Sequence, residues 1–469
     1  MSMRQPLFSL LPRPQPMALA GKRVLVLGLG DTGLAVARWA TRLGARVRVA
    51  DTRQAPPRGA DLKAAELVTG AFDSRLLQGV DLVCISPGLA LSEPLVQEAL
   101  ARGIPLAGEI ELFAWHLRGG ANAGRVVAVT GTNGKTTVSA LTGHLLRAAG
   151  FDCEVAGNIG PAALEALMRR LDAANPPAVW VLELSSYQLE TTWSLAPDAA
   201  AMLNLSEDHL DRYAGLAEYG AAKARVFQGQ GVQVLNRDDP RSAALALPGR
   251  RHITFGLDAP PGPEDFGMVS RNGRRWLAQG DAALIEAEAL PIHGRHNAAN
   301  ALAAAALARA VGAGRKAIGA GLRTFRGLPH RLERVALSRG VAWYDDSKGT
   351  NVGATIAALR GLEGHVVLIA GGDGKGQDFA PLAAPVAERA RRVLLIGRDA
   401  PRIARALEPS GVPLEQCDSL EQAVARAAAC AQPGDAVLLS PACASFDMFR
   451  DYRHRGEVFA AAVRRLANG

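Results

Sequence analysis

The residues with the most specific chemistry form a glycine-rich turn at positions 131–137, GTNGKTT. The turn follows a strand-like run that begins at Arg125, and a helical pattern extends from it to Arg147. Backbone N–H groups at a helix N-terminus bind phosphate oxygens, a lysine contacts the terminal phosphates and a hydroxyl holds Mg²⁺. The turn departs from the standard phosphate loop, because Val129 occupies the place of the first glycine. It predicts a site for ATP or another nucleoside triphosphate.

Two further segments with metal-binding side chains each follow a predicted strand in the same part of the chain. Glu183 ends the apolar run 178–182, and His209 lies in the acid-rich segment 206–212, SEDHLDR. A carboxylate at the carboxyl end of a strand beside a phosphate loop is well placed to bind Mg²⁺. Taken alone, such an acid is more often bound only to water. We therefore treat both segments as candidate metal or phosphate ligands.

Lysine is scarce in this chain. Seven of the 53 basic residues are lysines, so the chain uses arginine wherever either residue would serve. Four of the seven, Lys135, Lys223, Lys348 and Lys375, lie in unusual local motifs. Because lysine and arginine are not interchangeable where a compact or reactive amine is needed, we infer that these four have functions specific to lysine.

A second glycine-rich turn, GLGDTG, occupies positions 28–33. Asp51 lies 18 residues after Gly33, where an NAD-binding protein carries the acid that binds the ribose. The turn itself predicts only that a pyrophosphate is held at a helix N-terminus. It does not distinguish NAD from a UDP-sugar.

Strands and helices alternate along three stretches of the chain, which predicts an α/β fold with parallel sheets. We expect a Rossmann-like domain at 21–121, a central P-loop ATPase domain with a mostly parallel sheet at 122–326, and a Rossmann-like domain at 327–469. The length of 469 residues allows about three domains of roughly 100–200 residues. Residues 1–20 are proline-rich, and we expect them to form a flexible extension.

Composition excludes several classes of protein. Hydrophobic residues make up 48% and charged residues 21%, which is ordinary for a globular chain, and no apolar run reaches the ~20 residues that cross a bilayer. We expect a cytoplasmic protein without membrane contact. The five cysteines include no CxxC pair, which argues against disulfides and a zinc site. The net charge of +8 is dispersed, so we expect no nucleic acid; a polyanionic small substrate would also suit it.

Taken together, these motifs resemble those of the Mur ligase family of cell-wall synthesis. The resemblance covers nearly all of the chain beyond the N-terminal extension and rests on ten segments. They are GTNGKTT (131–137), GNIG (157–160), ELSSYQLE (183–190), SEDHLDRY (206–213), AAK (221–223), GRHNAANALAA (294–304), GLPHRLE (327–333), DDSKGTNVGAT (345–355), GGDGKGQDF (371–379) and SPACASFDMF (440–449).

The resemblance implies an ATP-dependent, amide-bond-forming ligase of peptidoglycan precursor synthesis. Within the family, the motifs are most similar to those of the member that joins D-glutamate to UDP-N-acetylmuramoyl-L-alanine. That reaction proceeds through an acyl phosphate and releases ADP and phosphate. The implied partners are these two small molecules, the implied cofactors are two Mg²⁺ ions and a CO₂-derived carbamate on a lysine, and we expect a monomer.

The resemblance also implies roles for individual residues. Those implied in catalysis are Lys135, Glu183, His209 and Lys223. Those implied around ATP are Gly131, Thr132, Asn133, Gly134, Lys135, Thr136, Thr137, Asn297, Asn300, Arg331 and Asp346. Those implied as metal ligands are Thr136, Glu183, His209 and Lys223, the lysine being carbamylated. An ammonium group cannot ligate a cation, whereas a carbamate offers the anionic oxygens that Mg²⁺ prefers.

The two remaining sets bind the substrates that are joined. Those implied around the UDP substrate are Asp31, Thr32, Asp51, Thr52, Arg53, Gly88, Asn158 and His209. Those implied around D-glutamate are Thr350, Lys375, Ser445 and Tyr452. Asp31 and Tyr452 depart from the residues that are more usual in the family at their positions, and Lys348 lies close enough in sequence to Asp346 to assist it.

Other functions remain open on the sequence. A sibling ligase would add another amino acid or act on a folate, but the DNPR-type motif of the diamino-acid ligase is missing and a whole α/β stretch precedes the ATP loop. An NAD-dependent oxidoreductase would use the turn at 28–33 and leave the ATP loop without a function. A nucleotide-binding regulatory protein without turnover would have no need of the lysines at 135, 223 and 375.

Overall fold

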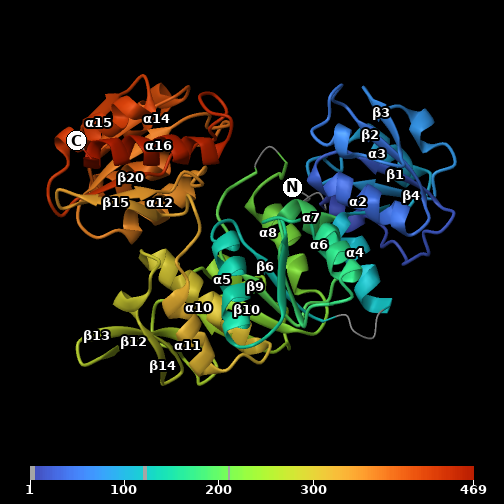
Figure 1. The fold of residues 1–469 in the computed structure, drawn as a ribbon, viewed down its shortest axis with the longest axis horizontal. Coiled ribbons are helices and arrows are strands. Elements are labelled where there is room, and N and C mark those ends of the chain that lie inside the picture. Colours follow the sequence, from blue (N-terminus) through green and yellow to red (C-terminus); the bar gives the residue numbers. More distant parts are fainter. Residues whose placement is uncertain (1–5, 120–123, 210–211, 469) are drawn as a thin grey trace, which may run out of the picture. The chain divides into compact units, whose positions relative to one another are not determined.

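The computed structural model describes residues 6–119, 124–209 and 212–468, and its strands form three sheets (Figure 1). The chain divides into two compact units. One comprises residues 1–255, 262–266 and 303–318, and the other comprises 256–261, 267–302 and 319–469. The predicted α/β class with mostly parallel sheets is confirmed, whereas the predicted domain boundaries stay predictions. None of the described helices is long and apolar enough to cross a membrane.

The first sheet is parallel, with the strand order β3-β2-β1-β4-β5. Its strands are β1 (Arg23–Leu27), β2 (Arg46–Asp51), β3 (Glu66–Thr69), β4 (Leu82–Ile85) and β5 (Leu106–Ala107), and its helices are α2 (Asp31–Arg42), α3 (Pro94–Ala101) and α4 (Glu109–Gly119). The central strands β1 and β4 are almost entirely apolar, as expected for strands covered on both faces. The strand order reverses between β1 and β4, and ligands of open α/β sheets bind at such a reversal.

The second sheet has the order β14-β13-β12-β11-β10-β9-β6-β8-β7. Its strands are β6 (Arg125–Thr130), β7 (Cys153–Gly157), β8 (Val179–Glu183), β9 (Ala199–Met202), β10 (Val232–Asn236), β11 (His252–Phe255), β12 (Phe266–Arg271), β13 (Arg274–Gln279) and β14 (Ala282–Glu286). Its helices are α5 (Lys135–Ala148), α6 (Ala163–Asp172), α7 (Ser186–Glu190), α8 (Leu216–Ala224), α9 (Pro240–Ala243), α10 (Arg295–Ala310) and α11 (Arg315–Thr324). β6 lies between β8 and β9 and is parallel to both, so the loops that follow these three strands meet at one edge.

The third sheet, in the second unit, has the order β15-β16-β20-β17-β18-β19 and is parallel except for the pair β15–β16. Its strands are β15 (Glu333–Ser338), β16 (Val341–Asp345), β17 (Val366–Gly371), β18 (Ala390–Ile396), β19 (Leu414–Gln416) and β20 (Ala436–Leu439). Its helices are α12 (Val352–Gly361), α13 (Ala383–Arg389), α14 (Ala400–Leu407), α15 (Leu420–Cys430) and α16 (Tyr452–Asn468).

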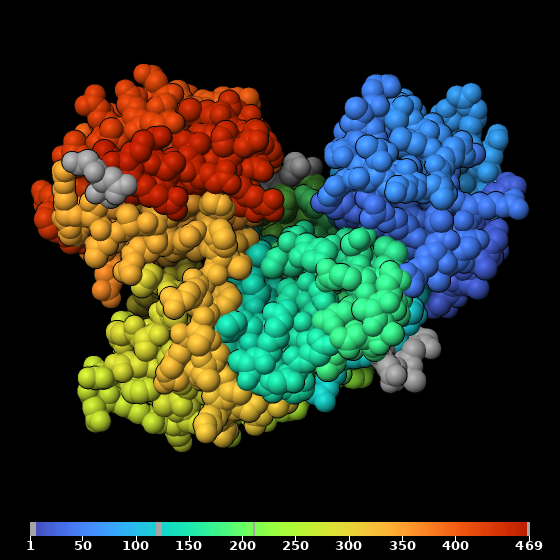
Figure 2. Space-filling model, in the orientation of Figure 1, coloured from blue at the N-terminus to red at the C-terminus, as the bar shows by residue number. Residues whose placement is uncertain are grey.

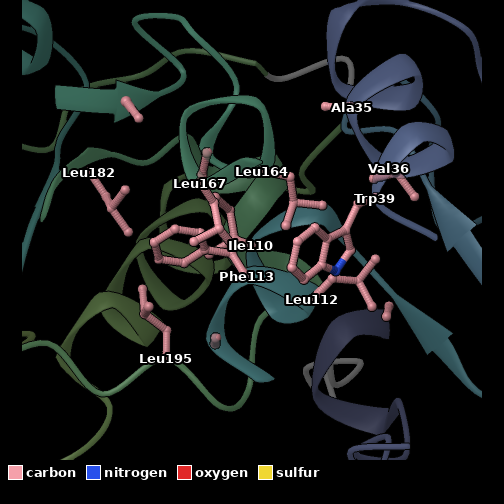
Figure 3. Packing of buried hydrophobic residues seen from close by; sticks show 14 of the residues in the cluster. Ala35, Val36, Trp39, Ile110, Leu112, Phe113, Leu164, Leu167, Leu182 and Leu195 are labelled. Atoms are coloured by element: carbon pink, nitrogen blue, oxygen red, sulfur yellow. The ribbon is translucent and has the colours of Figure 1, made fainter. Parts of the chain in front are cut away.

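One hydrophobic core joins the first sheet to the second within the first unit. Trp39 of α2, Phe113 of α4 and Leu164 of α6 belong to a single buried cluster (Figure 3). The Phe113 ring meets Trp180 of β8 edge to face at 5.1 Å between centroids. The surface view accordingly shows the blue first domain directly against the teal and green segments of the central domain (Figure 2). The turn at 28–33 and the loop at 131–137 therefore belong to sheets that share one continuous hydrophobic core.

The N-terminal segment contains a buried aromatic residue, and its expected flexibility stays a prediction. From residue 6 onwards it is described by the structure, and it contains the short helix α1 (Leu7–Leu10). Phe8 and Leu19 are buried, and Phe8 packs in the cluster that contains Leu25 of β1 and Tyr219 of α8. The burial of Phe8 could not be predicted from the proline-rich sequence, because a single buried phenylalanine produces no periodic pattern.

Candidate active site

The loop at 131–137 has the geometry of a phosphate-binding turn. β6 ends at Thr130 and α5 begins at Lys135, so the loop lies at the helix N-terminus. Gly131 and Gly134 have φ values of +149° and +83°. A Cβ atom on Gly131 would lie 2.9 Å from the Leu203 Cβ, so both the backbone conformation and the space require glycine there.

Asn204, which follows β9, holds this loop in place. Its Oδ1 accepts a hydrogen bond from the Asn133 N–H at 2.8 Å, and its Nδ2 donates to the Asn133 carbonyl at 3.0 Å. The Thr132 N–H donates to the Asn204 carbonyl at 2.9 Å. The loop conformation therefore depends on a residue 71 positions later in the chain.

Glu183 is placed at the carboxyl end of β8 beside the loop, since it is in register with Val129 of β6. The side chain is 1% exposed. Its Oε1 accepts a hydrogen bond from the Asn158 Nδ2 at 2.8 Å, and among the described residues no partner contacts its buried Oε2. A buried carboxylate oxygen is costly to leave unpaired. A divalent cation at this atom would satisfy it, so the donor set fits Mg²⁺.

Lys223 of α8 also contacts the loop. Its side chain is 1% exposed, its Nζ donates a hydrogen bond to the Gly131 carbonyl at 2.9 Å, and it lies 4.5 Å from the centroid of the Tyr219 ring. Burial, reinforced by the charge of Lys135, lowers the pKa of Lys223 well below its usual range. The charged form of this amine is therefore disfavoured, and the neutral form is the nucleophilic one.

His209 approaches the same region through an unusual backbone conformation, with φ at +56°. Its Nδ1 is 2.7 Å from the Tyr187 hydroxyl, and its Nε2 is 3.8 Å from the Asp208 carboxylate. Asp208 in turn contributes electrostatically to Lys223. The phosphate loop, Glu183, Lys223 and the His209 segment therefore belong to one neighbourhood.

The turn at 28–33 is braced by Asp51. One carboxylate oxygen of Asp51 accepts a hydrogen bond from the Leu29 N–H at 2.7 Å, and the Arg53 side chain binds both oxygens. The Arg53 hydrogen bonds, together with those from the two backbone N–H groups, overcome burial and lower the pKa of Asp51 to about 2. Asp51 is therefore ionised, and much of its hydrogen-bonding capacity is used inside the protein.

Four further residues expected around the UDP substrate lie on the same edge of the first sheet: Asp31, Thr32, Thr52 and Gly88. Asp31 is exposed and pairs with Arg58 at 2.6 Å, Thr32 follows it in the first turn of α2, and Thr52 is exposed after β2. Gly88 lies in the loop after β4, where the preceding Pro87 carbonyl accepts a hydrogen bond from Arg212 at 3.1 Å. These loops follow β1, β2 and β4.

The residues of the second unit that are expected around ATP form two groups. In α10, the Asn297 Nδ2 donates to the His293 carbonyl at 2.7 Å, and the Asn300 Nδ2 donates to the Asn297 Oδ1 at 3.1 Å. Asp346 accepts hydrogen bonds from the Ser440 hydroxyl and the Leu332 N–H, and burial raises its pKa to about 7. The half-buried Arg331 adds an electrostatic contribution that opposes this rise.

The expected amino-acid cradle is assembled by Gln377. Its Nε2 lies within 3.1–3.4 Å of the carbonyl oxygens of Thr350, Gly374 and Ala442, so it joins three loops that follow neighbouring strands. Lys375 and Ser445 lie on two of these loops. Tyr452 begins α16, and the Lys348 Nζ lies 4.0 Å from the centroid of its ring.

Comparisons with known proteins identify the same three parts. The Mur ligase MurD-like N-terminal domain matches residues 22–108, the Mur ligase middle domain matches residues 129–308, and the Mur ligase glutamate ligase domain matches residues 330–443. A UDP-N-acetylmuramoylalanine–D-glutamate ligase from Nitrosospira multiformis is 58% identical, covering 96% of this chain and 97% of that protein. The chain belongs to the Mur ligase family.

Other members agree in sequence or in fold. The ligase of the same name from Aromatoleum aromaticum is 58% identical over 96% of this chain and 98% of that protein. Among solved structures, MurF from Acinetobacter baumannii has a TM-score of 0.61 at 19% identity, covering 95% of this chain and 91% of that one. UDP-N-acetylmuramate–alanine ligase MurC from Thermotoga maritima has a TM-score of 0.59 at 18% identity, with coverages of 95% and 99%. These two structures support the fold alone.

Several residues of the site were not predicted from the sequence. Asn204 braces the phosphate loop, Gln377 joins the cradle loops, and Tyr187 and Arg212 contact the His209 segment and the loop after β4. Each lies inside or next to a quoted motif, but its role depends on contacts with segments distant in the chain. The role of each predicted residue toward a substrate stays a prediction.

Proposed function

We propose that the protein joins D-glutamate to UDP-N-acetylmuramoyl-L-alanine with cleavage of ATP to ADP and phosphate. The convergence of Lys135, Glu183 and Lys223 around the Gly131 loop carries the phosphoryl-transfer part of this proposal. The identities of the two molecules that are joined rest on relatives of that name, which are 50–58% identical over 95–96% of this chain.

The proposed chemistry has two steps. An oxygen of the alanyl carboxylate attacks the γ-phosphorus of ATP, and the bond to the β-phosphate oxygen breaks, which gives an acyl phosphate and ADP. The amine of D-glutamate then attacks the acyl carbon, loses a proton and expels phosphate, which leaves with one oxygen of the original carboxylate. Catalysis of such a transfer depends mainly on positioning and on neutralising phosphate charge.

The loop residues supply the positioning. The N–H groups at the start of α5 face the triphosphate, and the helix dipole favours its negative charge. The Lys135 Nζ now donates to the carbonyls of Gly131 and Thr132 at 2.9 and 2.7 Å, which holds it over the loop. This amine is the group that would contact the β- and γ-phosphates.

Two divalent cations and a carbamate complete the proposed site. The unpaired buried oxygen of Glu183, together with the Thr136 hydroxyl, suits one Mg²⁺; His209 and Lys223 suit a second. The neutral Lys223 amine is the form that adds CO₂ with loss of one proton, and the resulting carbamate supplies two oxygen ligands. Bound Mg²⁺ would neutralise phosphate charge during transfer.

The second unit supplies the proposed acceptor site. The loops joined by Gln377 present the Lys375 ammonium and the Ser445 hydroxyl, which suit the carboxylates of an amino acid. The exposed Phe446 beside Lys375 and the Tyr452 ring offer apolar surface for the aliphatic part of that molecule. This arrangement supports an acidic amino acid as the acceptor.

Phosphate release in the presence of UDP-N-acetylmuramoyl-L-alanine, ATP and a panel of amino acids tests the proposal. We expect release with D-glutamate and none above background with L-lysine, diaminopimelate or L-alanine. Release with a diamino acid but not with D-glutamate would assign the protein to a sibling activity. Binding of NADH without any binding of the UDP substrate would contradict the proposed use of the first domain.

A further inference from the structure

An aromatic cluster surrounds His209. Three of the five tyrosines of the chain belong to it. The ring centroids of Tyr187 and Tyr219 lie 4.8 and 6.0 Å from that of the imidazole. The Tyr213 ring stacks on the Tyr187 ring, with 6.1 Å between their centroids. The Tyr187 hydroxyl contacts the imidazole Nδ1 at 2.7 Å, whereas the Tyr213 hydroxyl donates to Glu190 at 2.6 Å. The two stacked tyrosines thus direct their polar groups to different partners.

We propose that Tyr187 is a positioning residue that orients His209 toward a divalent cation; this inference rests on the proposed function, in which His209 is a cation ligand. With the proton on Nδ1, the imidazole donates to the Tyr187 oxygen and keeps the Nε2 lone pair for a metal. The Nε2 atom already lies 3.8 Å from the Asp208 carboxylate, so a nitrogen and an oxygen ligand are adjacent.

The backbone and the exposure of His209 explain why such a restraint is needed. The φ value of +56° is disfavoured for any residue with a Cβ. The side chain is 41% exposed, so the described tyrosine rings cover only part of it. A hydrogen bond to Nδ1 fixes the rotation of the ring, which packing alone does not.

Tyr187 is itself rigidly held. It lies in α7, whose N-terminus is closed by a capping box between Ser185 and Gln188. The Arg212 guanidinium lies 4.3 Å from the centroid of the Tyr187 ring, and it is fixed by both oxygens of the buried Glu190. A tyrosine that packs against both a cation and a stacked ring is a firm support for a ligand.

Manganese binding measures the effect without turnover. We would titrate Mn²⁺ into the enzyme with a non-hydrolysable ATP analogue and follow free Mn²⁺ by electron paramagnetic resonance. Tyr187→Phe removes the hydroxyl and keeps the ring, so we expect the weaker of the two Mn²⁺ ions to bind about tenfold less tightly. The tighter ion should bind as in the wild type, because Thr136 and Glu183 are unchanged. His209→Gln should weaken the same ion at least as much.

Tyr213→Phe is the matched control, since it removes a hydroxyl from the same cluster but one that contacts Glu190. We expect it to leave both Mn²⁺ affinities unchanged. Wild-type affinity in Tyr187→Phe alongside a loss in His209→Gln would overturn the positioning role and leave the proposed function standing. Equal weakening by both tyrosine variants would overturn it too, because the effect would then belong to the cluster as a whole. Unchanged binding in His209→Gln would remove His209 from the cation site and the inference with it.

Discussion

Lys135 and Lys223 both donate a hydrogen bond from Nζ to the carbonyl oxygen of Gly131, each at 2.9 Å. Two protonated amines at one carbonyl would repel each other, and the Lys223 side chain is buried. The pKa of Lys223 is accordingly lowered, first by burial and then by the charge of Lys135. The contacts of this loop thus disfavour the charged form of the Lys223 amine.

Replacing Lys223 tests whether this amine becomes an anionic ligand. We expect Lys223→Ala to reduce kcat by at least about a hundredfold, because a preorganised charged group at the transferring phosphate is lost. Added formate or acetate should restore part of the activity by replacing the carbamate. Lys316→Ala, which removes an exposed lysine of α11, should behave as wild type. A Lys223→Ala variant with full activity would show that the lysine is not needed near the cations.

Glu109 gives the stability a predictable pH dependence. Its side chain is buried between α4 and α6, where one oxygen accepts a hydrogen bond from the Leu164 N–H at 2.8 Å, and burial raises its pKa from 4.5 to about 7. The folded state therefore holds a proton that the unfolded state has released between about pH 4.5 and 7. The contribution of Glu109 to the free energy of unfolding is fully present below pH 4.5. About 3 kcal/mol of that free energy is lost as the pH rises through 7.

Glu109→Gln should remove this dependence, because the amide keeps the acceptor oxygen and does not ionise. We expect its Tm to exceed that of the wild type at pH 8 and the difference to shrink at pH 5, as measured by thermal unfolding. Glu111→Gln is the contrasting variant. The Glu111 carboxylate accepts hydrogen bonds from Trp115 and from the Trp193 and Ser194 N–H groups, so this change should destabilise by about 1–3 kcal/mol at pH 8. Parallel pH profiles for wild type and Glu109→Gln would contradict the prediction.

Asp51 should matter for the UDP substrate and not for ATP. Asp51→Ala frees the Leu29 N–H and the Arg53 side chain, so the turn at 28–33 loses its brace. We expect the KM for the UDP substrate to rise about tenfold, in line with 1–3 kcal/mol for an unsatisfied buried donor, while the KM for ATP stays unchanged. Asp31→Ala, at a position that is 74% exposed, should have a smaller effect. A rise in the KM for ATP instead would show that the two nucleotide turns are misassigned.

The amino-acid site is tested by Lys375. We expect Lys375→Ala to raise the KM for D-glutamate by roughly tenfold to a hundredfold, because a charge-assisted hydrogen bond to a carboxylate is lost. The KM values for ATP and the UDP substrate should not change. Arg398→Ala is the control. It removes a different positive charge, one that pairs with Asp373 of the loop that carries Lys375. An unaltered KM for D-glutamate in Lys375→Ala would place the acceptor elsewhere.

The sequence predicted best those features whose determinants lie close together in the chain. The loop around Lys135 is recognisable because its glycines, lysine and threonines are consecutive and follow a strand. The parallel sheets are recognisable because apolar strands such as β1 and β8 alternate with helices. Both depend on local residue order, which a sequence displays directly.

The features that escaped prediction depend on tertiary contacts. Asn204 braces the loop from 71 residues away, and Tyr187 meets His209 across 22 residues. Strand β3 has only four residues and none of them is buried, so it lacks the apolar run of the central strands. Phe8 is buried by surfaces of β1 and α8 that no local pattern reveals.

An isotope-transfer measurement tests the central claim most directly. The alanyl carboxylate of UDP-N-acetylmuramoyl-L-alanine would be labelled with ¹⁸O, and the phosphate released on addition of D-glutamate and ATP would be examined by mass spectrometry. If the carboxylate is activated as an acyl phosphate, one ¹⁸O atom appears in the phosphate for each amide bond formed. Unlabelled phosphate accompanying amide formation would contradict phosphoryl transfer to the carboxylate, and with it the role assigned to the loop around Lys135.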